Sequence, residues 1–492
     1  MKGGFVLLCV LSAVVAGSGP AGAAQGLRTA VVQYDSTPLE FARIKAAGAT
    51  AVRIDAQWDV IAPTFPGAGD QAKDPSNPNY HWSKLDQAVK LAKAQRLDPI
   101  VGIYSTPNWA GAVQPPPLRG PSVPRLDDWW NFATAIARRY SGSYAGLPRV
   151  RFWRVWNEPN LFWYLSPQFI SGVPAAPKLY RQMLNVFSQA VHTVRPDNRV
   201  IGGSLSPFTF QNSIAPLRFM RNLLCMSKGA HPRPTCRTTV NFDIWSHHPY
   251  TSGGPGHHAS KPDDVSLGDL PQMRRLLLAA YEAGHIRSHG PPPFWVTEFS
   301  WDSTPPDPHA VPATLEARWV AQALYNMWRS GVSLVSWFLI RDFDVKDAPF
   351  QSGLYFLGGN PKVPDWPKPA LTAFRFPFVA LRSGGDISIW GRTPSSRADE
   401  VTLEVKTVGG WRRLAFLRSQ PNGIFSTKLA LARVTKPVRR PIRHTDYSGV
   451  IRASQPSSYW RLDDPRGPSR ATPSAPRVAT SGAIWFSVCR AR

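Results

Sequence analysis

Two glutamates in this chain each stand at the end of a hydrophobic run, and together they have the chemistry to cleave an acetal. Glu158 closes the run Val150–Trp156 and is followed by Pro159, which cannot continue a hydrogen-bonded ladder. Glu298 closes a second run, Phe294–Thr297. Acetal cleavage needs one carboxylic acid to protonate the leaving oxygen and a second carboxylate to act at the anomeric carbon. The pair therefore predicts chemistry at a glycosidic bond.

For these glutamates to meet, their runs must be strands whose carboxyl ends share one edge of a sheet. Eight short apolar runs alternate with amphipathic stretches between residues 27 and 381. This alternation predicts a (β/α)8 barrel, an α/β fold. A doubly wound open sheet is the alternative, but no Gly-x-Gly-x-x-Gly follows the first strand. The runs are Ala30–Val32, Ala51–Ile54, Pro99–Ile103, Val150–Trp156, Val200–Gly203, Phe242–Ser246, Phe294–Thr297 and Leu334–Phe338.

The stretches between the runs show the spacing of helices with one apolar face. They are Trp82–Gln95, Asp127–Tyr140, Leu179–Val194, Leu270–Ala283 and Pro312–Arg329, the last of which Gly331 would stop. Four connections after strands are long, and active sites of barrels are built on that side. These connections are Pro63–Tyr80, Asn108–Pro124, Pro159–Ala176 and Thr251–Gly268.

From residue 384 to residue 492 the apolar pattern changes to a period of two, which predicts a small second domain of β-strands. Asn422–Gly423 marks a turn within it. The pattern resembles immunoglobulin-like or fibronectin-like sandwich modules, with a loose segment over residues 465–476. The predicted strands are Ile387–Trp390, Val401–Val405, Arg413–Leu417 and Phe425–Leu431, and Trp485–Cys489 has no clear assignment.

Residues 1–24 resemble a secretory signal peptide, with Lys2, an apolar core over Phe5–Ala16 and small residues near position 22. The apolar core is short for a membrane span, and no other segment approaches that length. We therefore expect a secreted protein. In an oxidising compartment Cys225 and Cys236 could form a local disulfide, which would leave Cys489 unpaired.

Net charge is +25, and residues 382–492 carry 20 Lys or Arg against 7 Asp or Glu. Such an excess would suit contact between the terminal domain and an anionic glycan or the cell envelope. The arginines are scattered instead of gathered in one run, and a GC-rich genome would give the same composition. No motif indicates nucleic-acid binding.

The two glutamate motifs resemble those of glycoside hydrolase clan A. The motif Trp156-Asn157-Glu158-Pro159-Asn160 on the fourth strand and Thr297-Glu298-Phe299 on the seventh match the clan in strand and in order. The context after Glu158 is closest to family 39, which includes β-xylosidases and α-L-iduronidases, and next to family 5. The resemblance spans residues 27–345 and implies a retaining mechanism with Glu158 as acid/base and Glu298 as nucleophile.

The resemblance implies roles for further residues at the ends of strands. Arg53 would lie near the nucleophile, although an ordinary ion-pair role has equal weight. Asn157 would bond the sugar 2-hydroxyl, which requires the strand to end or bulge there, because alternation would otherwise separate Asn157 from Glu158. The remaining substrate-binding candidates are His248 and Tyr250 after the sixth strand, Asn108 and Trp109 after the third, and Trp337 on the eighth, which could also be a core residue.

No metal or organic cofactor is implied. His247 and His248 are adjacent and so face opposite ways on a strand, and no third ligand accompanies them. Asp55 is a weaker catalytic candidate. Two other functions use the same residues: a non-catalytic carbohydrate-binding protein on a degenerate barrel, and a cell-wall transglycosylase. The presence of both glutamates favours a glycosidase acting on a polysaccharide or oligosaccharide.

Overall fold

The computed structural model describes residues 22–111, 123–359, 364–395, 397–407, 410–435, 458–461 and 485–490. The described residues divide into two compact units, with the boundary between Pro377 and Phe378. Most of the predicted signal segment (1–24) and the predicted loose segment (465–476) lie outside the described residues.

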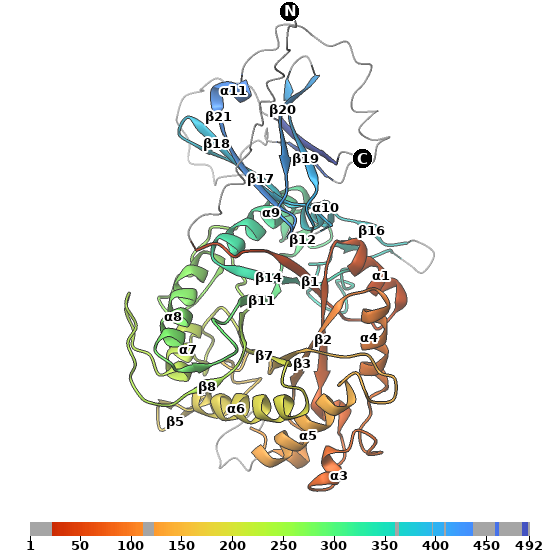
Figure 1. The fold of residues 1–492 in the computed structure, drawn as a ribbon, viewed down its shortest axis with the longest axis vertical. Helices are drawn as coiled ribbons and strands as arrows, with labels where there is room; N and C mark the ends of the chain where they lie inside the picture. Colours follow the sequence, from red (N-terminus) through yellow and green to blue (C-terminus); the bar gives the residue numbers. More distant parts are fainter. Residues whose placement is uncertain are drawn as a thin grey trace, which may run out of the picture. The chain divides into compact units, whose positions relative to one another are not determined.

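Eight parallel strands close into a barrel in the order β1-β14-β11-β9-β7-β4-β3-β2, which confirms the predicted (β/α)8 fold. Figure 1 shows these strands with helices α1, α4, α5, α6 and α8 lying around them. Each strand overlaps one predicted run. The strands are β1 (Arg28–Val32), β2 (Ala51–Gln57), β3 (Asp98–Tyr104), β4 (Phe152–Val155), β7 (Arg199–Leu205), β9 (Ile244–His247), β11 (Phe294–Phe299) and β14 (Val332–Trp337).

The barrel interior is a packed core. Each of the eight strands contributes one apolar side chain to a single contact cluster, as expected for a barrel filled by layers of side chains. Phe152 and Trp295 face each other in it with ring centroids 5.3 Å apart. The cluster consists of Ala30, Ala51, Ile100, Phe152, Ile201, Ile244, Trp295 and Leu334. Because this cluster fills the barrel interior, a site can form only at the carboxyl ends of the strands.

The five predicted helices are α4 (Ser83–Ala94), α5 (Leu126–Arg139), α6 (Ala176–Val194), α8 (Leu270–Glu282) and α9 (Ala313–Arg329). Gly331 takes a φ of +84° after α9, as its predicted role as a helix stop requires. Three further helices are α1 (Pro38–Ala46), α7 (Pro216–Leu224) and α10 (Pro369–Arg375). Each begins with a proline, which is favourable in the first turn and yet reads as a helix breaker in sequence.

The long connections follow β2, β3, β4 and β9, where they were predicted. The short elements are α2 (Trp58–Ile61), α3 (Asp70–Lys73), η1 (Asn108–Ala110), η2 (Leu267–Asp269), β5 (Phe169–Ile170), β6 (Val173–Pro174), β8 (Val240–Asn241), β10 (Ile286–Arg287), β12 (Ser303–Thr304), β13 (Val311–Pro312), β15 (Tyr355–Phe356) and β16 (Trp366–Pro367). They form two-stranded pairs or single turns in the connections.

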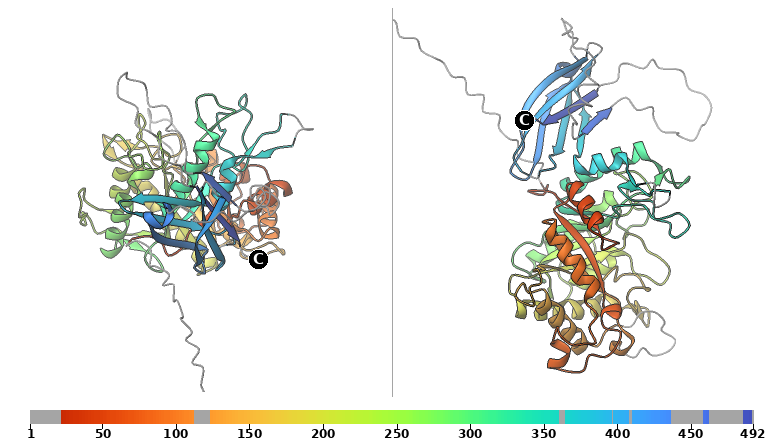
Figure 2. Two further views of the ribbon diagram at one scale, coloured as in Figure 1. Left: turned by 90° about the horizontal axis from the view of Figure 1, so that it is seen from above. Right: turned by 90° about the vertical axis from the view of Figure 1, so that its right-hand side faces the viewer.

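The second unit contains two antiparallel sheets, β17-β18-β21 and β20-β19-β23-β22, which confirms the predicted β domain. Its strands are the blue arrows of Figure 2. They are β17 (Phe378–Ser383), β18 (Asp386–Arg392), β19 (Glu400–Thr407), β20 (Gly410–Arg418), β21 (Ile424–Ala430), β22 (Ser458–Arg461) and β23 (Trp485–Arg490), with a short helix α11 (Leu431–Thr435) after β21.

Pairing in this unit adds three details to the sequence prediction. The predicted barrel domain ended at residue 381, but residues 378–381 belong to β17, which pairs with β18. The turn at Asn422–Gly423 leads from β20 in one sheet to β21 in the other, so it does not close a hairpin. The unassigned segment Trp485–Cys489 belongs to β23, which pairs with β19.

The structure joins Cys225 to Cys236 by a disulfide across the loop that follows α7. The side chain of Cys489 lies outside the described part of the chain. No helix among the described residues has the length and apolar character needed to cross a membrane.

Candidate active site

The backbone turns sharply where β4 ends, and the turn brings Asn157 and Glu158 to the same site. Strand β4 stops at Val155, and Trp156 and Glu158 take φ values of +69° and +40°. Left-handed backbone at non-glycine residues is unfavourable and is concentrated at functional sites. The Trp156 and Glu158 amides donate to the carbonyls of Ile103 and Ser204 at 2.8 and 3.0 Å, which anchors the turn to β3 and β7. Strand β4 therefore ends before Asn157, and this allows the side chains of Asn157 and Glu158 to enter the same site.

Glu298 lies near the end of β11, and both of its carboxylate oxygens accept hydrogen bonds. The Tyr250 hydroxyl donates to Oε1 at 2.9 Å. The Arg53 guanidinium donates to Oε2 through Nη1 and also to the Thr297 carbonyl at 3.1 Å. A cation and a hydroxyl donor both stabilise negative charge on the carboxylate and fix its orientation. The Glu298 carboxylate is thus fixed in orientation by Arg53 and Tyr250.

Glu158 has a different environment, with a single side-chain hydrogen bond among the described residues. His248 Nδ1 lies 3.0 Å from Glu158 Oε1 and 3.9 Å from Glu298 Oε2. The nearest oxygens of the two glutamates are therefore at most about 6.9 Å apart, the two distances laid end to end. Burial and the Glu298 charge raise the pKa of Glu158 to about 8, against the opposing effect of Arg53 and Arg154. Glu158 is thus protonated at neutral pH.

Two buried arginines and Asp55 form an ion-pair cluster beneath the glutamates. Arg53 binds Asp55 through two hydrogen bonds of 3.0 and 2.8 Å, and Arg154 donates to the same carboxylate at 2.6 Å. Burial alone would raise the pKa of Asp55, but the two guanidinium groups outweigh it and lower the pKa. Because both oxygens of Asp55 are bound by arginine, Asp55 anchors the cluster and is not available for proton transfer.

The same arginines orient Asn157. Its Oδ1 accepts from Arg53 Nη2 at 3.2 Å and from Arg154 Nη1 at 2.9 Å. With the carbonyl side of the amide bound in this way, the NH2 group is left to donate to a ligand. This orientation suits the contact with a sugar hydroxyl that the resemblance implies for Asn157.

Three predicted substrate-binding residues have other environments. Trp337 is 1% exposed, and its indole donates to the Ser352 carbonyl at 2.8 Å. Asn108 is exposed and Trp109 is half-buried on η1, where the Trp109 indole donates to the Ala62 carbonyl at 2.7 Å. No described contact joins any of the three to Glu158 or Glu298.

The structure adds site residues that were not predicted. Arg154 is fully buried in β4. Thr297 on β11 lies beside His248, which follows β9. Tyr104 and Tyr164 pack with ring centroids 6.4 Å apart, and burial raises the pKa of each to about 12. Arg154 did carry a signal, since a charge inside the apolar run Val150–Trp156 is unexpected in a buried strand. The hydroxyl of Thr297 carried none, because threonine is common in strands.

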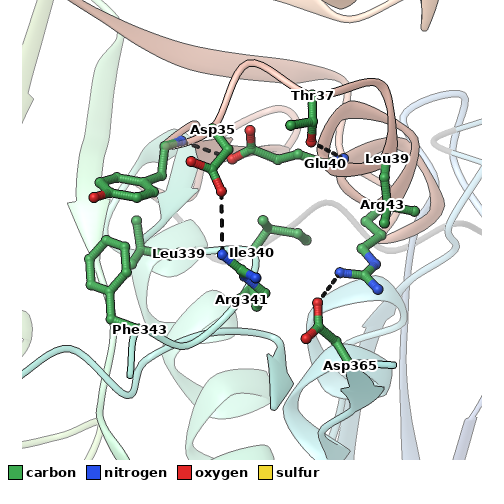
Figure 3. A pocket seen from close by; sticks show the side chains of 11 residues that line it. Asp35, Thr37, Leu39, Glu40, Arg43, Leu339, Ile340, Arg341, Phe343 and Asp365 are labelled. Atoms are coloured by element: carbon green, nitrogen blue, oxygen red, sulfur yellow. Dashed lines mark hydrogen bonds and ion pairs between the residues drawn. The ribbon is translucent and has the colours of Figure 1, made fainter. Parts of the chain in front are cut away.

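A separate pocket of about 280 Å³ lies at the carboxyl ends of β1 and β14 (Figure 3). Its charged groups are engaged with one another: Arg43 with Asp365, and Arg341 with Asp35 at 3.3 Å. Glu40 accepts from a backbone amide, and burial raises its pKa to about 7. Neither Glu158 nor Glu298 lines this pocket, so we assign it no part in the chemistry.

His192, Asp243 and His289 form a cluster with the composition of a metal site near the amino ends of β7 and β9. The contacts of His192 argue against that role. Its Nδ1 lies 2.7 Å from the Ser188 carbonyl and its Nε2 lies 3.0 Å from the Asn198 carbonyl. A carbonyl only accepts, so both ring nitrogens must carry hydrogen and neither can bind a metal. His192 is therefore a cation, paired with Asp243 at 3.4 Å.

This pair predicts a pH dependence of stability. Burial alone would lower the pKa of His192, but Asp243 and the two carbonyls outweigh it and raise the pKa above 6.5. The pair therefore stabilises the fold fully below pH 6.5, and the contribution is lost as pH rises through the folded-state pKa. Urea unfolding at pH 5.5 and 9 should show a larger loss of stability for the wild type than for His192→Gln. Equal losses, or a higher Tm with zinc chloride, would contradict the assignment.

No protein-family model and no curated protein matches the chain. Among solved structures it is similar to a GH39 enzyme from Xanthomonas axonopodis pv. citri (16% identity, TM-score 0.48, covering 83% of this chain and 93% of that one). It is similar to a monomeric β-xylosidase from Caulobacter crescentus CB15 (17%, TM-score 0.48, 83% and 97%). A GH30 endoxylanase from Clostridium papyrosolvens C71 is similar at 12% identity (TM-score 0.41, 83% and 94%). Family 39, which the glutamate motifs resemble, is among these structures.

Proposed function

We propose that this protein is a retaining glycoside hydrolase that cleaves O-glycosidic bonds of an oligosaccharide or polysaccharide by double displacement. One observation carries the proposal: two half-buried carboxyl groups share one site and have opposite environments. Glu298 is bound by a cation and a hydroxyl, whereas Glu158 contacts a neutral imidazole. This is the division between an ionised nucleophile and a protonated acid that acetal cleavage requires.

The separation of the carboxylates is compatible with retention. Inverting enzymes hold their carboxyl groups about 6.5–9.5 Å apart to admit a water, whereas retaining enzymes hold them about 5–5.5 Å apart. The nearest oxygens of Glu158 and Glu298 lie at most about 6.9 Å apart, which is close enough for both groups to act at one anomeric carbon. This spacing permits direct attack by Glu298 on the anomeric carbon, and the resemblance to the retaining clan supports that step.

The first step then breaks the bond between the anomeric carbon and the leaving oxygen. Glu298 forms a bond to that carbon, and Glu158 gives its proton to the leaving oxygen. Glu158 is then a carboxylate and acts as a base in the second step, taking a proton from the attacking water. The water oxygen replaces Glu298 at the anomeric carbon, and both residues return to their starting states. A saccharide acceptor in place of water would make the same chemistry a transglycosylation.

The proposal includes export from the cell. Residues 1–24 have the pattern of a secretory signal, and a disulfide such as Cys225–Cys236 persists in oxidising compartments. We also propose that the basic terminal domain contacts an anionic glycan or the cell envelope, because its net charge over residues 382–492 is strongly positive.

The configuration of the first product tests the mechanism. A panel of nitrophenyl glycosides and polysaccharides identifies a substrate, and proton NMR then follows the anomeric signal of the sugar as it is released. We expect the anomer of the substrate to appear first and the other anomer to follow by mutarotation. If the opposite anomer appears first, Glu298 is not a nucleophile and the double-displacement proposal is wrong.

A further inference from the structure

A line of hydroxyl groups leads from Glu158 into the interior of the barrel. His248 contacts Glu158 through Nδ1, and its Nε2 lies 3.2 Å from Thr297 Oγ1. Thr297 Oγ1 lies 3.3 Å from Ser204 Oγ, which lies 2.8 Å from Ser246 Oγ. Each of the four side chains beyond Glu158 has 0% exposure, so no solvent reaches the line from their side. The hydrogen bonds along it must therefore be satisfied within the line itself.

The far end of the line has a defined direction. The Ser246 hydroxyl lies 3.0 Å from the Gly202 carbonyl, which can only accept, so Ser246 donates to it. Ser246 Oγ also accepts from the Ser204 backbone amide at 3.0 Å, which leaves it one lone pair. That lone pair can accept the Ser204 hydroxyl. Ser204 Oγ in turn accepts the Thr297 hydroxyl, and Thr297 Oγ1 accepts hydrogen from His248 Nε2.

This order determines which nitrogen of His248 carries hydrogen. Burial, together with the charges of Arg53 and Arg154, lowers the pKa of His248 well below 6.5, so the ring is neutral and has one N–H. If that N–H is at Nε2, then Nδ1 presents a lone pair to Glu158. A carboxylate facing a lone pair has no hydrogen bond there, whereas a protonated carboxyl group donates one.

The reverse order has one hydrogen bond fewer. If Nδ1 carried the hydrogen, His248 Nε2 would accept from Thr297, and Thr297 would accept from Ser204. Then either Ser204 Oγ has no donor, or the Ser246 hydroxyl turns to Ser204 and leaves the Gly202 carbonyl. A lost hydrogen bond at a buried hydroxyl is unfavourable, so the order that ends on a protonated Glu158 is preferred.

We propose that Ser246, Ser204 and Thr297 are positioning residues that act through His248 to hold Glu158 in its protonated form. The inference rests on the proposed function, since it explains how the acid of that reaction is kept ready. It also assigns the line a second use. The hydroxyl groups can each donate or accept, so the line can reverse and let His248 donate to Glu158 once the proton has left.

Other charged groups also face Glu158, and the line acts in addition to them. Glu298 on β11 favours the protonated form of Glu158, whereas Arg53 on β2 and Arg154 on β4 favour the ionised form. Tyr164 and Tyr250 face it from the connections after β4 and β9. None of these residues is altered by a substitution at Thr297, so the contribution of the line can be measured by itself.

The test replaces Thr297 by valine, which has the same shape and no hydroxyl. We expect the alkaline limb of kcat/KM to move down by about one pH unit, because the free energy of one pKa unit is about that of one hydrogen bond. Above pH 8 this shift corresponds to about a tenfold loss with a phenyl glycoside, and we expect less than about a twofold loss with the dinitrophenyl glycoside of the same sugar, whose leaving group needs no proton. Thr297→Ser should restore both. Thr29→Val, a buried change on β1, should show neither effect.

A measurement without substrate keeps this inference separate from the proposed function. Protein labelled with ¹⁵N-histidine, with His248 assigned by comparison with His248→Gln, should show His248 protonated at Nε2 and unprotonated at Nδ1 at pH 6. In Thr297→Val this preference should be lost. Protonation at Nδ1 in the wild type, or an unchanged pH profile in Thr297→Val, would overturn the inference. Absence of hydrolysis with every glycoside would instead refute the proposed function and leave the tautomer to decide the inference.

Discussion

Glu298→Gln is expected to lower kcat by about 10⁴-fold or more while the barrel stays folded. The amide has nearly the shape of the carboxylate but cannot form the glycosyl-enzyme bond. Arg53 keeps its two hydrogen bonds to Asp55, so the cluster beneath the site remains paired. The measurement is steady-state hydrolysis of an aryl glycoside, with circular dichroism and Tm as checks on folding. Glu282→Gln, an exposed change at the end of α8, is the matched control and should behave as wild type.

Azide makes the same prediction specific to the nucleophile. In Glu298→Ala the space left by the side chain can admit azide, which then attacks the anomeric carbon from the face that Glu298 occupied. With a dinitrophenyl glycoside we expect a glycosyl azide of the opposite anomeric configuration. In a Glu158→Ala protein azide instead attacks the glycosyl-enzyme, so its product should retain the configuration. The reverse pattern would exchange the roles of the two glutamates.

The barrel was predictable because each strand is a separate apolar run and each predicted helix shows one apolar face. The helices that escaped prediction, α1, α7 and α10, are short and begin with proline, where the favourable first-turn position and the breaker signal look alike. In the second unit, the strands were predictable from their period, but their pairing was not. Nothing local shows that the chain crosses between sheets at Asn422–Gly423, because that depends on long-range packing.

The two glutamates and their partners Arg53, His248 and Tyr250 were predictable because each follows the end of a strand, and the ends of parallel strands meet. The hydroxyls of Ser204 and Thr297 were not, since serine and threonine are ordinary in strands and their role depends on direct neighbours. For Trp337, the position in the sequence could be predicted but the burial could not. It lies at the end of β14, where a sugar site is expected, but its 1% exposure is a property of tertiary packing that sequence does not report.

The second prediction concerns pH and Glu158. The acid step needs a protonated carboxyl group, so kcat/KM of the wild type should fall as pH rises through the Glu158 pKa of about 8. Glu158→Gln removes the titrating group, so this alkaline limb should disappear. The variant should lose about 10²–10⁴-fold with a phenyl glycoside and much less with a dinitrophenyl glycoside. An unchanged alkaline limb in Glu158→Gln would show that another group, such as Tyr164 or Tyr250, sets it.

Stability supplies an independent check on the same pKa. Because the pKa of Glu158 is raised from 4.5 to about 8, folding favours its protonated form, and stability is lost as pH rises between these values. Above pH 8 the half-buried Glu158 carboxylate lies near the Glu298 carboxylate without an ion-pair partner of its own among the arginines. Glu158→Gln carries no charge, so its unfolding free energy should fall less than that of the wild type between pH 5 and 9. A protein in which both measurements place the group near pH 8 has its acid and its nucleophile divided by environment, as acetal cleavage requires.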